Sequence, residues 1–106
     1  MAISTITLTG KSKTQYRFNI YPRPQEFKAI GAIYVMAKKT DATTYRLIYI
    51  GQTSDASQRP LNHHRTDCFD KNGADHILLL SEGSEKRRLE IETDPIRAYD
   101  PPCNRQ

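Results

Sequence analysis

The stretch YRLIYIGQTSDASQRPLNHH, residues 45–64, decides how this chain is organised. Its first part, residues 45–52, is rich in aromatic and β-branched side chains, which favours a β-strand. Gly51 stands at the end of that strand. Pro60 is unfavourable inside a helix but welcome at the first helical position. We therefore expect a strand over 45–52 and then a helix that starts at Pro60, with Arg59 near its N-terminus.

The preceding segment, KAIGAIYVMAKK at residues 28–39, is apolar on both faces, as a central strand would be. Only the short polar segment 40–44 separates it from residues 45–52. We expect the two strands to form a hairpin. A third strand is predicted in ADHILLLSEG, residues 74–83, where Gly83 ends the apolar run.

The N-terminal region alternates between apolar and polar residues, which is the period of two expected of half-buried strands. Gly10 supplies a turn, so residues 1–21 predict a hairpin. Pro22 and Pro24 stop the ladder because proline has no N–H to donate. This hairpin could extend the sheet, contact a substrate or pair with another copy of the chain, so a dimer is an open alternative.

The last regular segment, residues 84–94, predicts a helix with Ser84 as its N-cap. The order of elements indicates an α+β fold with a small central antiparallel β-sheet flanked by helices. A chain of 106 residues buries one core. We expect a single globular unit, made of an N-terminal β-hairpin extension over 1–27 and the remaining domain over 28–106.

Composition limits the classes of partner. Sixteen lysines and arginines against twelve acidic residues give a net charge of +4 and a pI near 9.2. Either an ordinary solvated surface or a polyanion partner such as DNA or RNA explains this excess. No run approaches the roughly 18 apolar residues of a membrane span. Two cysteines are too few for a disulfide framework, and no secretory leader is recognised, so we predict a cytoplasmic protein with free thiols.

The last predicted helix contains an anomaly. Leu89, Glu92, Ile96 and Tyr99 follow at spacings of three, four and three, which predicts one helical face turned to the core. A carboxylate in that stripe needs a cation, either an arginine or a metal, unless it sits at an edge and reaches solvent. Pro95 should kink this helix or end it near residue 94.

Two short motifs, each of which contains a tyrosine, and four polar residues later in the chain form a recognisable set. GAIYV contains Tyr34, and YIG contains Tyr49 and Gly51. Arg59 follows eight residues after Gly51, and three further polar residues complete the set: His63, Glu92 and Asn104. This set resembles the GIY-YIG nuclease domain over residues 31–104.

The resemblance implies hydrolysis of nucleic-acid phosphodiesters, most simply those of DNA, with one divalent cation, Mg²⁺ or Mn²⁺. Tyr34 and Tyr49 match the two motif tyrosines, and Tyr34 would orient or deprotonate the attacking water. His63 matches a histidine that can take part in proton transfer. An ordinary tyrosine has a pKa near 10, so nearby positive charge would have to favour the tyrosinate.

The same resemblance assigns three further roles. Arg59 would bind the phosphate, for which its planar and permanently charged donors are well suited. Glu92 would be the metal ligand, which would supply the cation that a buried carboxylate needs. Asn104 would brace the site. Flanking phosphate contacts could come from a group of basic residues that could equally be solvated: Lys38, Lys39, Lys86, Arg87 and Arg88.

Three positions depart from the family pattern. Ala32 stands between the glycine and the Ile-Tyr pair, Pro60 directly follows Arg59, and Pro95 interrupts the helix that carries Glu92. Two alternatives to the nuclease therefore stay open. One is a nucleic-acid-binding module on the same scaffold with weak or no catalysis. The other is a covalent tyrosine nucleophile, which would leave a protein–DNA adduct.

Overall fold

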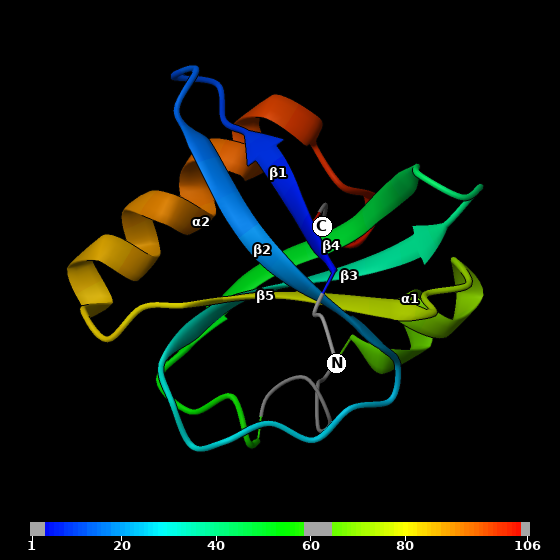
Figure 1. The fold of residues 1–106 in the computed structure, drawn as a ribbon, viewed down its shortest axis with the longest axis horizontal. Helices are drawn as coiled ribbons and strands as arrows, with labels where there is room; N and C mark the ends of the chain where they lie inside the picture. Colours follow the sequence, from blue (N-terminus) through cyan, green and yellow to red (C-terminus); the bar gives the residue numbers. More distant parts are fainter. Residues whose placement is uncertain (1–3, 59–64, 105–106) are drawn as a thin grey trace.

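The computed structural model describes residues 4–58 and 65–104. It is an α+β fold in which a curled five-stranded antiparallel sheet carries two α-helices and a short 3₁₀ turn (Figure 1). The strands are β1 (Thr5–Thr9), β2 (Gln15–Pro22), β3 (Ala32–Lys39), β4 (Tyr45–Thr53) and β5 (His76–Ser81); the helices are α1 (Thr66–Lys71), α2 (Glu85–Tyr99) and the 3₁₀ turn η1 (Pro102–Asn104).

The strand order is β1-β2-β5-β3-β4, and every neighbouring pair is antiparallel. The two predicted hairpins are confirmed as β1–β2 and β3–β4, with β5 inserted between them. Strand β3 is an internal strand that pairs with β5 on one side and β4 on the other, which fits its apolar sequence, and residues 32–37 are all buried. Strand β4 lies at an edge of the sheet, which leaves one side of its backbone open to other elements.

Each face of the sheet carries its own apolar cluster. One cluster packs beneath α1 and η1 and includes Tyr34, Phe69 and Cys103. The other lies on the α2 side and includes Leu8, Phe18 and further residues: Ile33, Val35, Ala37, Ile50, Leu78 and Ile91. The N-terminal hairpin contributes Leu8 and Phe18 to this second cluster and pairs with β5, so it is an integral part of the sheet.

Helix α2 begins as predicted and ends later than predicted. The Ser84 hydroxyl caps it by accepting the Arg87 N–H at 3.3 Å. The helix continues through Pro95 to Tyr99, so of the two predicted alternatives at Pro95, a kink or an end, the end near Asp94 is wrong. Burial of the Pro95 ring and hydrogen bonds that fix Asp94 offset the missing N–H: the Asp94 carboxylate accepts bonds from Ser12 and Tyr16 of the first hairpin.

The predicted core-facing stripe of α2 is also wrong. Its buried residues are Arg88, Ile91 and Pro95, whereas Leu89 is 45% exposed and Tyr99 43% exposed. The buried face keeps the helical spacing of three and four but starts one residue earlier. The difference arises because the buried face includes Arg88, a charged residue that an apolar pattern does not select. In the fold Arg88 is satisfied by three acceptors, described below.

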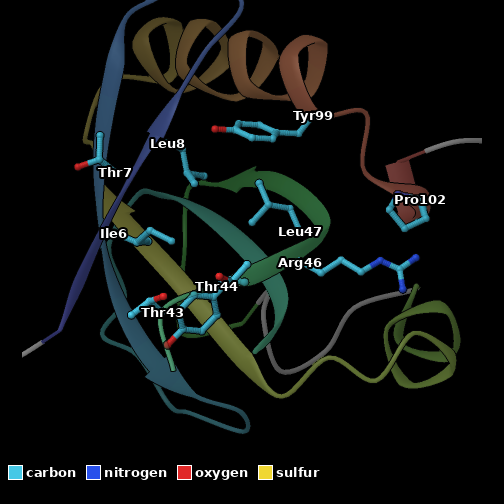
Figure 2. Close-up of a pocket in the computed structure, with 10 residues that line it drawn as sticks. Ile6, Thr7, Leu8, Thr43, Thr44, Arg46, Leu47, Tyr99 and Pro102 are labelled. Atoms are coloured by element: carbon cyan, nitrogen blue, oxygen red, sulfur yellow. The ribbon is translucent and has the colours of Figure 1, made fainter. Parts of the chain in front are cut away.

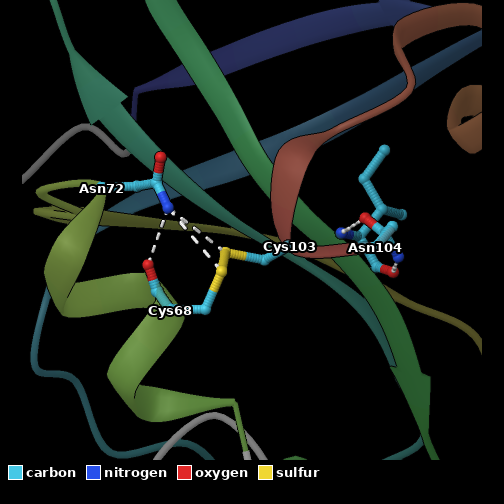
Figure 3. The surroundings of a disulfide bond; sticks show 5 residues. Cys68, Asn72, Cys103 and Asn104 are labelled. Carbon is cyan, nitrogen blue, oxygen red and sulfur yellow. Dashed lines mark hydrogen bonds between the residues drawn. A yellow bond between two sulfur atoms is a disulfide. The ribbon is translucent and has the colours of Figure 1, made fainter. Parts of the chain in front are cut away.

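The prediction of free thiols is wrong as well. Cys68 of α1 and Cys103 of η1 form a disulfide across 35 positions of the chain (Figure 3). The Asn72 side chain donates to the Cys68 carbonyl at 2.9 Å and lies within reach of both sulfur atoms. The sequence does not show that two cysteines so far apart along the chain lie close together in space. Only the tertiary fold places them within bonding distance. Among the described residues, no helix has the length and apolar character to cross a membrane.

Candidate active site

Asn104 is anchored to the YIG segment of β4. Its side-chain oxygen accepts the Ile50 N–H at 2.9 Å, and its side-chain nitrogen donates to the Ile50 carbonyl at 2.8 Å (Figure 3). The Ile50 N–H and carbonyl point away from β3, toward the open side of the edge strand β4. Asn104 therefore continues the hydrogen-bonding pattern of the sheet by one residue. Asn104, which the sequence predicted to brace the site, is held in place by these two bonds.

Glu92 reaches the same edge from the other side of the sheet. It projects from α2, and the backbone N–H of Gln52 lies near enough to its carboxylate to favour the charged form and lower its pKa. Gln52 lies two residues after Ile50, about 7 Å along an extended strand. Asn104 and Glu92 thus lie at neighbouring outward-facing positions of one strand, although they come from different elements.

Gly51 lies between these two anchors, and the motif tyrosines crowd it. A Cβ atom at position 51 would lie 2.7 Å from Cζ of Tyr34, 2.8 Å from its hydroxyl oxygen and 2.7 Å from Cε2 of Tyr49. Only glycine leaves room for the phenol to approach the backbone this closely. The two tyrosine rings are 6.0 Å apart, and Tyr49 also packs 5.3 Å from Phe69. Tyr34, Tyr49, Glu92 and Asn104 therefore each lie next to one of residues 50–52, with Glu92 approaching from the opposite side of the sheet.

Glu92 is a half-buried carboxylate at the margin of the buried face of α2. Burial raises the pKa of its carboxyl group, and the Gln52 N–H partly offsets this effect. Among the residues that the structure describes, no lysine, arginine or histidine lies within ion-pair distance of Glu92. Its charge is therefore compensated by a single N–H dipole within this part of the chain.

The donor set at Glu92 fits one kind of metal site only. The described residues contain no cluster of three or more His, Cys, Asp or Glu side chains, which rules out a closed cage within them. Mg²⁺ commonly uses one or two carboxylates and fills its remaining positions with water and substrate phosphate oxygens. A lone, partly desolvated carboxylate such as Glu92 fits that pattern.

Two of the predicted site residues cannot be placed. Arg59 and His63, together with the predicted helix start at Pro60, lie outside the described residues. The chain is described again from residue 65, and α1 begins at Thr66.

Arg88 takes a role that the sequence did not indicate. It is only 5% exposed, and its Nε donates to the Gln52 side-chain oxygen at 3.0 Å. Its Nη1 donates to the carbonyl oxygens of Glu82 and Gly83, each at 3.0 Å. These bonds fix the start of α2 against β4 and hold the side chain of Gln52, the residue whose backbone N–H lies near Glu92. Arg88 is thus a positioning residue rather than a flanking phosphate contact.

Gly31 explains how this arginine fits. A Cβ atom there would lie 2.5 Å from Nη1 of Arg88 and 2.7 Å from the Glu82 carbonyl oxygen. The remaining basic residues of the predicted group are exposed, and Arg87 pairs with Glu90 at 2.9 Å. Sequence analysis could have found Arg88 only from its spacing of three before Ile91.

Comparisons with known proteins yield no match, whether to a protein-family model, to a curated protein or to a solved structure.

Proposed function

We propose that this chain is a metal-dependent endonuclease of the GIY-YIG type that hydrolyses DNA phosphodiester bonds. The observation that carries the proposal is the gathering of a phenol, a carboxylate and an amide around three consecutive residues of β4, positions 50–52. These side chains come from β3, α2 and η1, which only the fold brings together.

Each group has a task in phosphodiester hydrolysis. Tyr34 orients and deprotonates the attacking water, and Tyr49 packs beside it. Asn104 acts as a positioning residue, because its paired bonds to Ile50 hold the strand against which the phenols pack. A preorganised site needs no rearrangement when charge develops on the phosphate.

Glu92 is the proposed ligand of a single Mg²⁺ or Mn²⁺. Such a cation supplies positive charge to a phosphate that becomes more anionic during reaction. Glu92 suits this role because it is partly desolvated and carries no described ion-pair partner. The basic balance of the chain favours the approach of a polyanion.

Arg59 and His63 complete the proposal on the basis of the sequence resemblance alone. Arg59 would bind the non-bridging phosphate oxygens, and His63 would accept or relay the proton. The alternative function is a nucleic-acid-binding module that has kept this arrangement without efficient catalysis, with Pro95 as its suspected cause.

A cleavage assay separates the two functions. Purified protein is incubated with supercoiled plasmid and with branched and single-stranded DNA, in Mg²⁺, in Mn²⁺ and in chelator. We expect metal-dependent nicking that Tyr34→Phe and Glu92→Gln reduce by at least about a hundredfold, as for loss of an acid–base group. Tyr21→Phe and Glu90→Gln are matched controls, because these residues lie away from residues 50–52.

Each outcome has a distinct meaning. DNA binding without cleavage in any metal would favour the binding module. A covalent adduct trapped on Tyr34 would replace the water mechanism with a tyrosine nucleophile. Equal loss in Tyr34→Phe and Tyr21→Phe would remove the special role of the motif tyrosine.

A cytoplasmic location and a dimer through the N-terminal hairpin remain proposals. The disulfide bears on the location, because disulfides persist mainly in oxidising compartments. Trapping of thiols by alkylation in intact cells, followed by mass spectrometry of Cys68 and Cys103, tests the location. Sedimentation equilibrium tests the dimer.

A further inference from the structure

We propose that the groove between β1 and β4 binds an extended peptide segment with an acidic side chain, which adds a strand between these two edges. This site is separate from the proposed active site and does not depend on the proposed function. Four observations support it. They are the groove itself, the shared direction of β1 and β4, the outward-facing backbone groups of these strands, and the positive charge of the residues that line the groove.

A cavity of about 450 Å³ lies between the two edge strands (Figure 2). Its β1 wall is formed by Ile6, Thr7 and Leu8, and its β4 wall by residues 45–47. The Tyr99 ring projects across one end (Figure 2). This volume lies within the range of sites that hold ordered ligands, roughly 300–1,000 Å³.

A second cavity of about 280 Å³ extends the groove along the same strands. It shares Ile6, Thr43 and Tyr45 with the first and adds Ser4 and further residues: Thr5, Ile20, Lys39 and Ala42. The two cavities therefore form one groove that follows the length of β1, as an extended chain would require.

The directions of the walls specify the kind of strand that fits. All four neighbouring pairs in the order β1-β2-β5-β3-β4 are antiparallel, so β1 and β4 run in the same direction. The two edges cannot pair antiparallel with each other. One added strand of opposite direction would be antiparallel to both and would close the curled sheet.

Backbone groups along both walls face the groove. On β1, the bond from the Ile20 N–H to the Ser4 carbonyl turns the even-numbered residues toward β2, which leaves Thr5 and Thr7 facing outward. On β4, the bond from the Thr40 N–H to the Thr44 carbonyl leaves Tyr45 and Leu47 facing outward.

The outer edge of β1 is blocked at Thr9, the last residue of the strand. The outward N–H of Thr9 donates to the Tyr99 hydroxyl at 3.1 Å, so pairing is possible only along the earlier part of β1. That part has none of the usual protection of an exposed edge: β1 reads TITLT, without a charge or a proline. Strand addition to such an edge is a common mode of peptide recognition.

The charge of the groove selects an acidic peptide. Its described lining contains two cationic residues, Lys39 and Arg46, and no aspartate or glutamate. Arg46 is exposed, and none of the described residues forms a hydrogen bond or ion pair with its guanidinium. The Lys39 ammonium lies 5.9 Å above the Tyr45 ring. The nearby Asp41 carboxylate accepts the Thr43 N–H within its own turn.

The test uses a capped heptapeptide of alternating valine and threonine with a central glutamate. Titration into ¹⁵N-labelled protein should shift the amide signals of Thr5, Thr7, Tyr45 and Leu47, and slow their hydrogen exchange. Arg46→Gln should weaken binding about tenfold, the effect of one hydrogen bond to a charged group. Arg17→Gln, an exposed arginine of β2 outside the groove lining, is the matched control.

Two further measurements test strand pairing itself. Thr7→Pro removes one outward N–H of β1 and should weaken binding while the thermal unfolding temperature shows that the fold is intact. N-methylation of alternate peptide amides should abolish binding of the heptapeptide, and a central lysine in place of glutamate should weaken it.

Several results would overturn the proposal. The proposal is contradicted if millimolar peptide causes no shift at these four amides. It is also contradicted if the N-methylated peptide binds as tightly as the unmodified heptapeptide. Shifts at the same amides with oligothymidylate but not with the peptide would assign the groove to single-stranded nucleic acid instead. Because the measurement needs neither metal nor cleavage, its failure leaves the proposed nuclease function unaffected.

Discussion

Asn104 and Ile50 are joined by two reciprocal hydrogen bonds of 2.9 and 2.8 Å across 54 positions of the sequence. The C-terminal turn thereby occupies the outer edge of β4 at the first residue of the segment 50–52. Glu92 approaches the backbone N–H of the next outward-facing residue, Gln52, so Asn104 and Glu92 together mark the proposed site.

Replacing Asn104 by aspartate should destabilise the protein. The variant keeps the size of the side chain but removes the N–H donor and presents a carboxylate to the Ile50 carbonyl. We expect a loss of about 1–3 kcal/mol in the free energy of unfolding, with reduced DNA cleavage. Urea unfolding measures the first effect. Asn19→Asp in β2 is the control and should change stability by less than about 0.5 kcal/mol. Equal losses in both variants would contradict the bracing role.

Glu92 should couple metal binding to pH. Burial raises the pKa of its carboxyl group in the fold, so its contribution favours folding at pH values below the ordinary 4.5 and is lost as pH rises through the folded pKa. Without metal at pH 7, Glu92→Gln should therefore not lower the unfolding temperature. Millimolar Mg²⁺ should raise that temperature in the parent protein and not in Glu92→Gln.

The effect of Mg²⁺ on the unfolding temperature should also fade on acidification, because a protonated carboxyl group does not bind the ion. Glu90→Gln, on the exposed side of the same helix, should retain the full effect. An undiminished Mg²⁺ effect in Glu92→Gln would place the cation elsewhere.

Gly51→Ala should disturb both motif tyrosines. The new methyl group would approach the Tyr34 and Tyr49 rings to 2.7 Å, so the rings or the strand must shift. Overpacking of this kind costs about 1–3 kcal/mol, and we expect cleavage to fall with it. Gly83→Ala is the control because no atom lies within 4 Å of its added Cβ. Differential scanning calorimetry and the plasmid assay compare the pair.

Reduction of the Cys68–Cys103 disulfide should weaken the attachment of η1. The bond closes a loop of 35 positions, and loss of such a bond costs about 2–4 kcal/mol. Because Asn104 directly follows Cys103, faster exchange of the Ile50 amide should accompany the loss. Hydrogen exchange with and without a dithiol reductant measures it. A Cys68→Ser variant that keeps a slow Ile50 amide would show that Asn104 holds the turn by itself.

Asp94→Asn should change the response to acid. Hydrogen bonds from Ser12 and Tyr16 lower the pKa of the Asp94 carboxyl group. The stability that they supply is therefore present above the ordinary value of 3.8 and is lost as pH falls through the folded pKa. The variant should lack this part of the acid transition, followed by circular dichroism. An unchanged acid midpoint would show that the contact contributes nothing.

Local patterns in the sequence predicted much of the fold. The alternation of residues 5–9 and 15–22 and the apolar run at 32–37 follow from the periodicity of strands, which depends only on near neighbours. The Ser84 cap likewise depends on a hydroxyl and an N–H three residues apart. These features need no knowledge of the rest of the chain.

The errors share a different cause. Arg88 is buried because the carbonyl oxygens of Glu82 and Gly83 and the side chain of Gln52 surround it. Pro95 is tolerated because the helix around it is held by packing and by the hairpin loop. In both cases long-range contacts outweigh a residue's intrinsic preference.

The sequence by itself determined the strands, the cap of α2 and the choice of candidate residues, because these depend on side-chain type and short spacing. Only the tertiary structure decided that Asn104 and Glu92 come to neighbouring positions of one edge strand, that Arg88 is buried, and that Cys68 meets Cys103. Those contacts join residues far apart in the chain, and their geometry exists only after the sheet has curled and its edges have been covered.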